Sequence, residues 1–349
     1  MQHPIRPALW LLALLLLVAT GLPPAHADDG AEAESEAKKE DAPRDVLSTG
    51  NLKGLAFRSI GPALMAGRVG DLAVDPENPS HYYVAACSGG VWKTTNGGTT
   101  YKPIFDGQGS YSIGCVTLDP QNAATVWVGT GENNSQRSVS FGDGVYRSRD
   151  GGASWQHMGL KTSEHIGMIT VDPRDSDTVY VASQGPLWRA GGERGLYKPV
   201  DGGKTWKRIL HVSDDTGINE VHLDPRNPDV LYASSYQRRR RVWTLINGGP
   251  ESAIYKSEDA GATWRKINKG LPGVDLGRIG LGVSPADPDI VYAIVEAAQG
   301  KSGFYRSTNR GERWEKRGTY KPTGAQYYNE IVCDPVNPDR VYALHTILR

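Results

Sequence analysis

Ser148-Arg149-Asp150-Gly151-Gly152-Ala153-Ser154-Trp155 decides the fold, because its pattern, S-x-D-x-G-x-T/S-W, recurs along the chain. A second full copy runs from Ser257 to Trp264, a third keeps most positions, and two degenerate copies have Asn in place of Asp. We expect each copy to be a β-hairpin in which the Asp or Asn caps the turn, Gly supplies a positive φ, and the aromatic ring packs on neighbouring strands. The residues in these roles are Asp150, Trp155, Asp201, Trp206, Asp259, Trp264, Asn309 and Trp314.

A second motif, an alternating apolar strand that ends in Asp-Pro, recurs between the hairpin copies. Its prolines are 44, 53, 52, 60 and 50 residues apart, a period typical of propeller blades rather than of helical solenoids. Proline fixes φ in such a turn, and the aspartate side chain can accept a hydrogen bond from the backbone two residues on. The turn residues are Asp75, Asp119, Asp172, Asp224, Asp334 and, in one degenerate copy, Ser284.

Together the two motifs predict an all-β fold, a β-propeller of four-stranded antiparallel blades. In the first blade we expect strands at residues 69–74, 82–86, 91–94 and 101–104. The chain provides five complete blades and the first two strands of a sixth. Either residues 55–60 add an outer strand to the last blade or, as we favour, the chain is truncated and forms the front part of a larger propeller.

The first 27 residues are predicted to be a cleaved signal peptide. Arg6 gives a positive start, residues 9–20 form an apolar stretch too short to span a bilayer, and Ala25-His26-Ala27 provides a cleavage pattern. Residues 28–50 are a charged, flexible linker with little to bury, and residues 51–349 form the propeller domain. We therefore expect an exported protein, periplasmic or extracellular, that is cut after Ala27 and has no stable membrane insertion.

The 349 residues include 39 basic and 39 acidic side chains, and this balance argues against nucleic acid as a partner. Cys87, Cys115 and Cys333 lie in apolar strand-like segments without metal-binding spacing. We expect buried thiols there, with a Cys87–Cys115 bridge as the alternative. No metal or other cofactor is predicted, because the sequence has no His/Cys/Asp constellation and no phosphate-binding Gly loop.

The hairpin segments, such as Tyr146-Arg147-Ser148-Arg149-Asp150-Gly151-Gly152, resemble the Asp-box, or bacterial neuraminidase repeat, family of propellers. The resemblance covers roughly residues 55–349. The chain looks most similar to bacterial sortilin N-terminal-like and glycosyl-hydrolase-like repeat proteins and, more distantly, to xyloglucanases and sialidases. The resemblance implies a propeller, but it implies little about activity because the motif forms structural turns.

We expect a ligand site on the face opposite the hairpin turns, where long connections join the second and third strands of blades two to four. These connections combine arginines, carboxylates and aromatic rings, which suit a glycan or peptide groove. In the alternative interpretation, Glu132, Arg137 and Asp143 bridge one another, the Arg238–Arg241 run is a solvated loop, and His165 lies at the surface or supports a neighbouring residue. The predicted ligand contacts are Arg137, His165, Trp188, Arg194, Arg238, Arg239 and Trp243.

The resemblance to xyloglucan-cleaving enzymes and sialidases is weaker at the positions of their catalytic residues. Xyloglucan-cleaving enzymes place a catalytic aspartate before a Gly-Gly pair in the first blade, and this chain has Ser88 there. Phe57-Arg58-Ser59-Ile60-Gly61-Pro62 only loosely matches the sialidase pattern. If the protein is a glycosyl hydrolase, Glu132 and Asp143 are the candidate carboxylates, because inverting hydrolysis needs two.

The sequence therefore favours an exported propeller that binds a glycan or polypeptide on its long-loop face. One alternative is a glycoside hydrolase related to the xyloglucan-cleaving enzymes. A second alternative is a periplasmic assembly or sorting factor. Polysaccharide turnover that is lost in Glu132→Gln or Asp143→Asn would distinguish the hydrolase from a binding protein.

Overall fold

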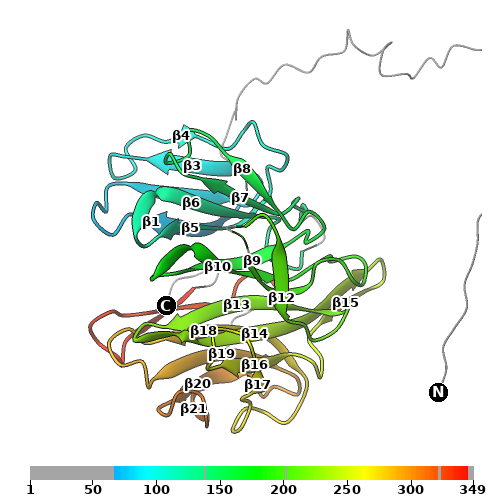
Figure 1. Cartoon of the computed structure of the whole chain (residues 1–349). Helices are drawn as coiled ribbons and strands as arrows, with labels where there is room; N and C mark the ends of the chain where they lie inside the picture. The colour runs from blue at the N-terminus through cyan, green and yellow to red at the C-terminus, as the bar shows by residue number, and fades with distance from the viewer. Residues whose placement is uncertain (1–66, 137–138, 200, 202, 321–323, 345–349) are drawn as a thin grey trace, which may run out of the picture. The chain divides into compact units, whose positions relative to one another are not determined.

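The computed structural model describes residues 67–136, 139–199, 201, 203–320 and 324–344, all of which belong to one unit, residues 60–349. The expected signal peptide, the linker and the strand at residues 55–60 lie outside the described residues. The described part is built from β-strands joined by turns (Figure 1). It contains no helix long and apolar enough to cross a membrane.

The strands form one antiparallel sheet for each repeat, as predicted. Among the described residues, five sheets have four or five strands and one has two. The first three blades contain β1 (Val69–Val74), β2 (Tyr82–Ala86), β3 (Gly90–Thr94), β4 (Lys102–Pro103), β5 (Ile113–Asp119), β6 (Asn122–Thr130), β7 (Val145–Ser148), β8 (Gln156–Gly159), β9 (Ile166–Asp172), β10 (Asp175–Ser183), β11 (Gly195–Pro199) and β12 (Trp206–Leu210). The others contain β13 (Thr216–Asp224), β14 (Asn227–Arg241), β15 (Thr244–Asn247), β16 (Ala253–Ser257), β17 (Arg265–Lys266), β18 (Leu276–Val283), β19 (Val291–Ala297), β20 (Gly303–Ser307), β21 (Glu315–Gly318), β22 (Glu330–Cys333) and β23 (Val341–Leu344).

The first strand of each sheet contacts the first strand of the next, from β1 through β5, β9, β13 and β18 to β22. These first strands are therefore innermost, and each sheet extends outward from them, which is the geometry of a propeller. Apolar side chains fill the space between consecutive blades; Trp127 of blade 2, for example, belongs to the same buried cluster as Val181 of blade 3. The predicted all-β propeller is confirmed.

The hairpin turns contain the hydrogen bonds expected from the motif. In blade 2, Asp150 Oδ1 accepts the Ser154 N–H at 2.8 Å, and Ser148 Oγ accepts the Gly152 N–H at 2.8 Å. Blade 4 repeats the pattern, with 2.8 Å between the Thr263 N–H and Asp259 Oδ1. Hydrogen bonds from Ser154 and Ser148 stabilise the ionised carboxylate and lower the pKa of Asp150 to about 2.

In blades 2, 3 and 5, the tryptophan that ends the hairpin joins its blade to the preceding one. The indole N–H of Trp155 donates to Ile104 O at 2.7 Å, that of Trp206 to Met158 O at 2.6 Å, and that of Trp314 to Ile267 O at 2.7 Å. The hairpin glycine is also required by this packing. At Gly261 φ is 87°, and a Cβ would lie 2.6 Å from Ile209 Cδ1 of the preceding blade.

The Asp-Pro turns and the hairpin turns lie on one face, here called the turn face. The Gly151 N–H of a hairpin donates to Ala124 O beside the preceding Asp-Pro turn at 2.8 Å. Asp224 Oδ1 accepts the Arg226 N–H two residues on at 2.9 Å, as predicted. The Arg226 side chain then reaches Asp289 of the next blade at 2.7 Å. Polar groups on this face therefore serve to hold consecutive blades together.

All three cysteines are free thiols. Cys87 and Cys115 are buried, and Cys333 is half-buried. Burial raises the pKa of the Cys87 thiol to about 12 and that of Cys115 well above its usual range. The alternative of a Cys87–Cys115 bridge is therefore wrong for this structure, and the thiols act as small apolar groups.

Candidate functional site

The face opposite the turn face, here called the loop face, carries the connections between the second and third strands and those between blades. Hydrogen bonds join the long connections of blades 2, 3 and 4 to one another and to the segment before β22. The Ser135 N–H donates to Gln326 O at 2.9 Å, and the Arg240 N–H donates to Leu187 O at 2.8 Å. The structure thus brings these connections together into one surface.

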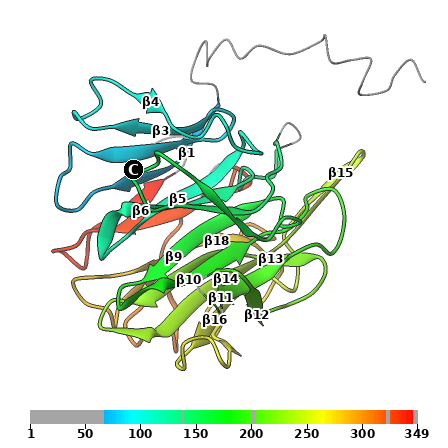
Figure 2. The same cartoon turned by 45° about the horizontal axis from the view of Figure 1, so that its top comes forward.

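The blade-4 connection is a β-hairpin. β14 runs beyond its own sheet and pairs with β15, so this hairpin projects from the loop face (Figure 2). Because side chains alternate along a strand, Arg238 and Arg240 are buried on one side, whereas Arg239 and Arg241 lie on the other. Arg239 forms an ion pair with Asp215. The solvated-loop interpretation is therefore wrong for two of the four arginines.

Residues 131–136, here called the plug segment, extend from blade 2 across the centre of the ring. Arg238 Nη1 donates to Asn134 O at 2.6 Å, and Arg240 Nε donates to Ser135 O. Arg278 Nη1 of blade 5 donates to Asn133 O at 3.0 Å. Because blades 4 and 5 hold a segment of blade 2, this segment covers the loop-face end of the central channel.

In the described structure, neutral groups rather than carboxylates accept the hydrogen bonds of Arg238: the backbone oxygen of Asn134 and the hydroxyl of Ser135. Burial, opposed by Tyr236 and helped by the positive charges of Arg194 and Arg278, lowers the pKa of Arg238 to about 9. Arg194 is similar: it is fully buried and donates to Gln184 O at 2.6 Å and to Arg189 O at 2.9 Å. These two of the four predicted ligand-binding arginines therefore hold loops in place, and neither is exposed.

Glu132 is fully buried in the plug segment. Its carboxylate accepts hydrogen bonds from Arg68 Nε and Asn134 Nδ2. His165 is buried too, and its Nδ1 lies 2.8 Å from the backbone oxygen of Glu132. Burial, together with the charge of Arg238, lowers the pKa of His165 well below its usual value, so a neutral ring donates its Nδ1–H and positions the plug segment. Neither side chain is open to a polymer in this conformation.

Asp143 ends the blade-2 connection and is half-buried. Its carboxylate accepts the Tyr146 hydroxyl at 2.7 Å and the Thr130 hydroxyl at 3.3 Å. Burial and the Asp143 carboxylate raise the pKa of Tyr146, which stays neutral as a donor. Glu132 and Asp143 thus have separate partners, and Arg137, the third member of the expected bridge, lies outside the described residues.

Among the described residues, four large aromatic side chains are exposed on the loop face. Tyr111 is 62% exposed, Phe141 72%, Trp188 48% and Trp243 77%. The Tyr111 hydroxyl lies 3.1 Å from Ser140 Oγ, next to Phe141, and Trp188 follows Leu187, which is bonded to the β14–β15 hairpin. Trp188 and Trp243 were predicted as ligand contacts. Tyr111 and Phe141 were not, although an aromatic residue in a connection on this face is the signal that could have identified them.

The central channel contains a cavity of about 540 Å³ with three carboxylates from three innermost strands. Asp71 Oδ2 accepts the Val116 N–H at 2.9 Å, and Glu220 Oε2 accepts the Leu281 N–H at 2.7 Å. Each carboxylate therefore bonds to the innermost strand of the next blade. Glu330 instead lies 3.8 Å from Arg278 Nη2. Burial raises the pKa of Glu330 to about 8. Among the described residues no group of three His, Cys, Asp or Glu side chains is placed to hold a metal.

The fold and these surfaces define a β-propeller with one face of structural turns and one face of long loops. No protein-family model matches the chain. It is 26% identical to a xyloglucanase of Hypocrea jecorina over 251 residues, 64% of this chain and 28% of the relative. It is also 26% identical to vacuolar protein sorting/targeting protein 10 of Eremothecium gossypii over 196 residues, 55% of this chain and 11% of that protein.

Among solved structures, the GH74 enzyme of Niastella koreensis superposes with a TM-score of 0.59 at 20% identity, over 79% of this chain and 43% of that one. The chain is thus a β-propeller related to xyloglucanases and to Vps10/sortilin-like proteins, as the hairpin motifs implied. It spans only 28% of the length of the Hypocrea jecorina xyloglucanase. The similarity therefore identifies the fold.

Proposed function

We propose that the protein binds a polysaccharide on its loop face. The exposed aromatic side chains of the loop face, Tyr111, Phe141, Trp188 and Trp243, carry this proposal. Large aromatic rings are normally buried, and a cluster of exposed ones marks a surface that contacts a ligand. The flat, apolar faces of pyranose rings stack on such side chains, and several exposed rings on one face suit a chain of sugars.

The turn face supports this choice by contrast. Its tryptophans donate to carbonyls of the preceding blade, as Trp155 and Trp314 do, and their rings pack between blades. The relatives named xyloglucanase also favour a polysaccharide ligand, because their name states that they act on xyloglucan. Xyloglucan is therefore the first polysaccharide to test.

The test is the affinity for soluble xyloglucan, measured by calorimetry, for the wild type and the double variants Tyr111→Ala/Phe141→Ala and Trp188→Ala/Trp243→Ala. We expect each double variant to lose about tenfold or more in affinity, because exposed aromatic anchors dominate binding energy. The midpoint of thermal unfolding should stay unchanged, because these rings are exposed. Tyr101→Ala, which removes an exposed ring from the turn face, is the matched control. Unchanged affinity in both double variants would refute the proposal.

Hydrolysis is the second candidate function, favoured by the relation to xyloglucanases. Asp143 is the carboxylate that solvent reaches, whereas Glu132 would need the plug segment to move first. Release of reducing ends in the same xyloglucan samples, lost in Asp143→Asn, would establish this activity. A polypeptide ligand, as for a sorting or assembly factor, is the third candidate and is favoured by the relation to the Vps10 protein.

We also propose that the protein is exported through its first 27 residues. The apolar stretch at residues 9–20 and the Ala25-His26-Ala27 pattern support this. The N-terminal sequence of the purified native protein tests it, and a mature chain that begins at Asp28 is the expected result.

A further inference from the structure

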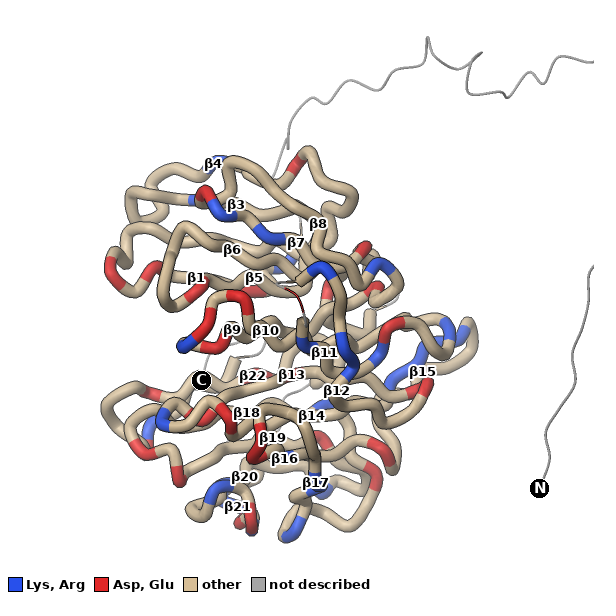
Figure 3. The backbone as a smooth tube through the Cα atoms, viewed as in Figure 1, with Lys and Arg blue, Asp and Glu red and all other residues tan. Residues whose placement is uncertain are grey.

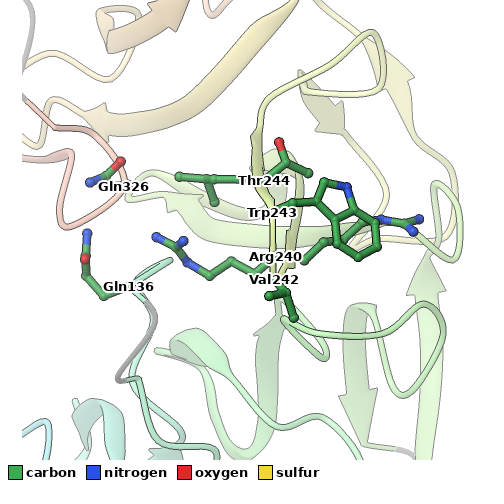
Figure 4. Close-up of a pocket in the computed structure, with 8 residues that line it drawn as sticks. Gln136, Arg240, Val242, Trp243, Thr244 and Gln326 are labelled. Carbon is green, nitrogen blue, oxygen red and sulfur yellow. The ribbon is translucent and has the colours of Figure 1, made fainter.

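A hollow of about 530 Å³ lies beside the β14–β15 hairpin on the loop face. One wall is the hairpin itself, with Arg240, Trp243 and Thr244, and across from it lie Gln136 of the plug segment and Gln326. Figure 4 shows the Arg240 side chain reaching from the hairpin toward the two glutamine side chains. This volume is within the range of sites that bind small ligands or one part of a polymer.

The lining of the hollow is basic. Arg240 and Arg241 both contribute to it, and none of its described lining residues is Asp or Glu. Arg241 has no carboxylate within ion-pair distance among the described residues, whereas its neighbour Arg239 is paired with Asp215. Figure 3 shows basic residues gathered along this hairpin. Buried Arg238 and Arg194, bonded to carbonyls, add positive charge nearby, and a water-poor wall strengthens their effect on an anion.

A buried donor beside the hollow also lacks a partner. Gln136 Nε2 is buried and has no hydrogen-bond partner in the described structure. A buried N–H group without a partner is costly, so such a group marks a place where a ligand oxygen or an ordered water belongs. An amide donor beside guanidinium groups is chemistry that binds carboxylates, with Trp243 and Leu245 available for the apolar face of a sugar.

We infer that this hollow binds the carboxylate of a uronic acid unit, so that the polysaccharide class recognised by the loop face is an acidic one. The inference rests on the proposed function, since it assumes that the loop face binds a polysaccharide, and it adds the charge of the ligand. The positively charged hollow binds the carboxylate, and the exposed aromatic side chains of the loop face bind the neighbouring sugar rings.

The experiment compares three probes by calorimetry: an oligogalacturonate, its fully methyl-esterified form, and a xyloglucan oligosaccharide. The wild type should bind the acid about tenfold more tightly than the ester, with a preference that shrinks as NaCl rises. Gln326→Glu places a carboxylate in the hollow and should abolish this preference without changing the affinity for the ester. Gln156→Glu, on exposed β8, is the matched control and should keep the preference. Arg241→Gln, at an exposed position, provides a second variant that should halve the preference or more.

Each result has one meaning. The inference is overturned if the oligogalacturonate and its ester bind with equal affinity, or if the preference for the acid survives both Gln326→Glu and Arg241→Gln. In either case, binding of the ester would still support the proposed function. Failure of all three sugars to bind overturns the proposed function itself. Polyglutamate is added as a competitor of the oligogalacturonate. If it displaces the oligogalacturonate and binds the wild type more tightly, the sugar assignment is overturned in favour of an acidic polypeptide.

Discussion

The tryptophan at the end of a hairpin joins neighbouring blades through one hydrogen bond in blades 2, 3 and 5, but not in blade 4. Trp314 is 2% exposed, and its indole N–H donates to Ile267 O of the preceding blade at 2.7 Å. Trp264 occupies the same motif position but is half-buried, and its indole donates within its own hairpin to Gly261 O at 3.1 Å. One motif position therefore makes different contributions to stability in different blades.

Trp314→Phe should lower the free energy of unfolding by about 1–3 kcal/mol, because it leaves Ile267 O buried without a donor and reduces packing. Trp264→Phe is the matched control and should cost less, because its ring is only half-buried and its longer hydrogen bond, 3.1 Å, stays within its own hairpin. Urea unfolding of the two variants and the wild type measures both values. A larger loss in Trp264→Phe than in Trp314→Phe would contradict the inter-blade role.

At the scale of elements, the β14–β15 hairpin and the plug segment form one unit. The alternation of side chains along β14 directs Arg238 toward Asn134 O and Arg239 toward Asp215. Two neighbouring residues of the same type thus act in opposite ways. The first fixes a segment from another blade, and the second forms an ion pair at the surface.

Arg238→Met should loosen the plug segment, because Asn134 O loses its charged donor. We expect amide hydrogen exchange at residues 131–136 to accelerate at least tenfold and the free energy of unfolding to fall by about 1–3 kcal/mol. Arg239→Met removes a partly exposed ion pair and should change stability by less than about 1 kcal/mol, with no effect on exchange in the plug segment. Equal exchange in the two variants would show that Arg238 does not hold the segment.

The sequence predicts elements well where the determinants are local. The Asp224 turn and the Asp150 hairpin each depend on residues within four positions, so their hydrogen bonds follow from the motif alone. The plug segment is different. Its position depends on Arg238, which is 104 residues away from Asn134, and on Arg278, which is 145 residues away from Asn133. No local pattern contains such contacts, which explains why Glu132 and Arg238 were expected to be accessible.

For the whole molecule, the ring concentrates charge of opposite sign in different places. Arginines hold the plug segment at the loop-face end, whereas Asp71, Glu220 and Glu330 line the channel cavity. Asp71 and Glu220 are stabilised by backbone N–H groups of the next blade. The Glu330 carboxylate instead lies 3.8 Å from Arg278 Nη2. Burial and the charges of the other two carboxylates oppose the ionisation of Glu330.

This arrangement makes stability depend on pH in a defined direction. The pKa of Glu330 is raised to about 8, above the value of about 4.3 for an unfolded glutamate, so between these values the native state holds a proton that the unfolded state releases. Stability from this group is therefore present at low pH and is lost as pH rises from about 5 to 8, by up to about 1.4 kcal/mol per pH unit.

Glu330→Gln cannot ionise and should escape the loss. Urea unfolding from pH 5 to 9 should show equal stability of wild type and variant near pH 5 and a growing advantage of the variant up to pH 8. Glu315→Gln, on exposed β21, should follow the wild type. Parallel curves for the wild type and Glu330→Gln would mean that Glu330 is ionised in the native protein and that the channel stabilises its charge.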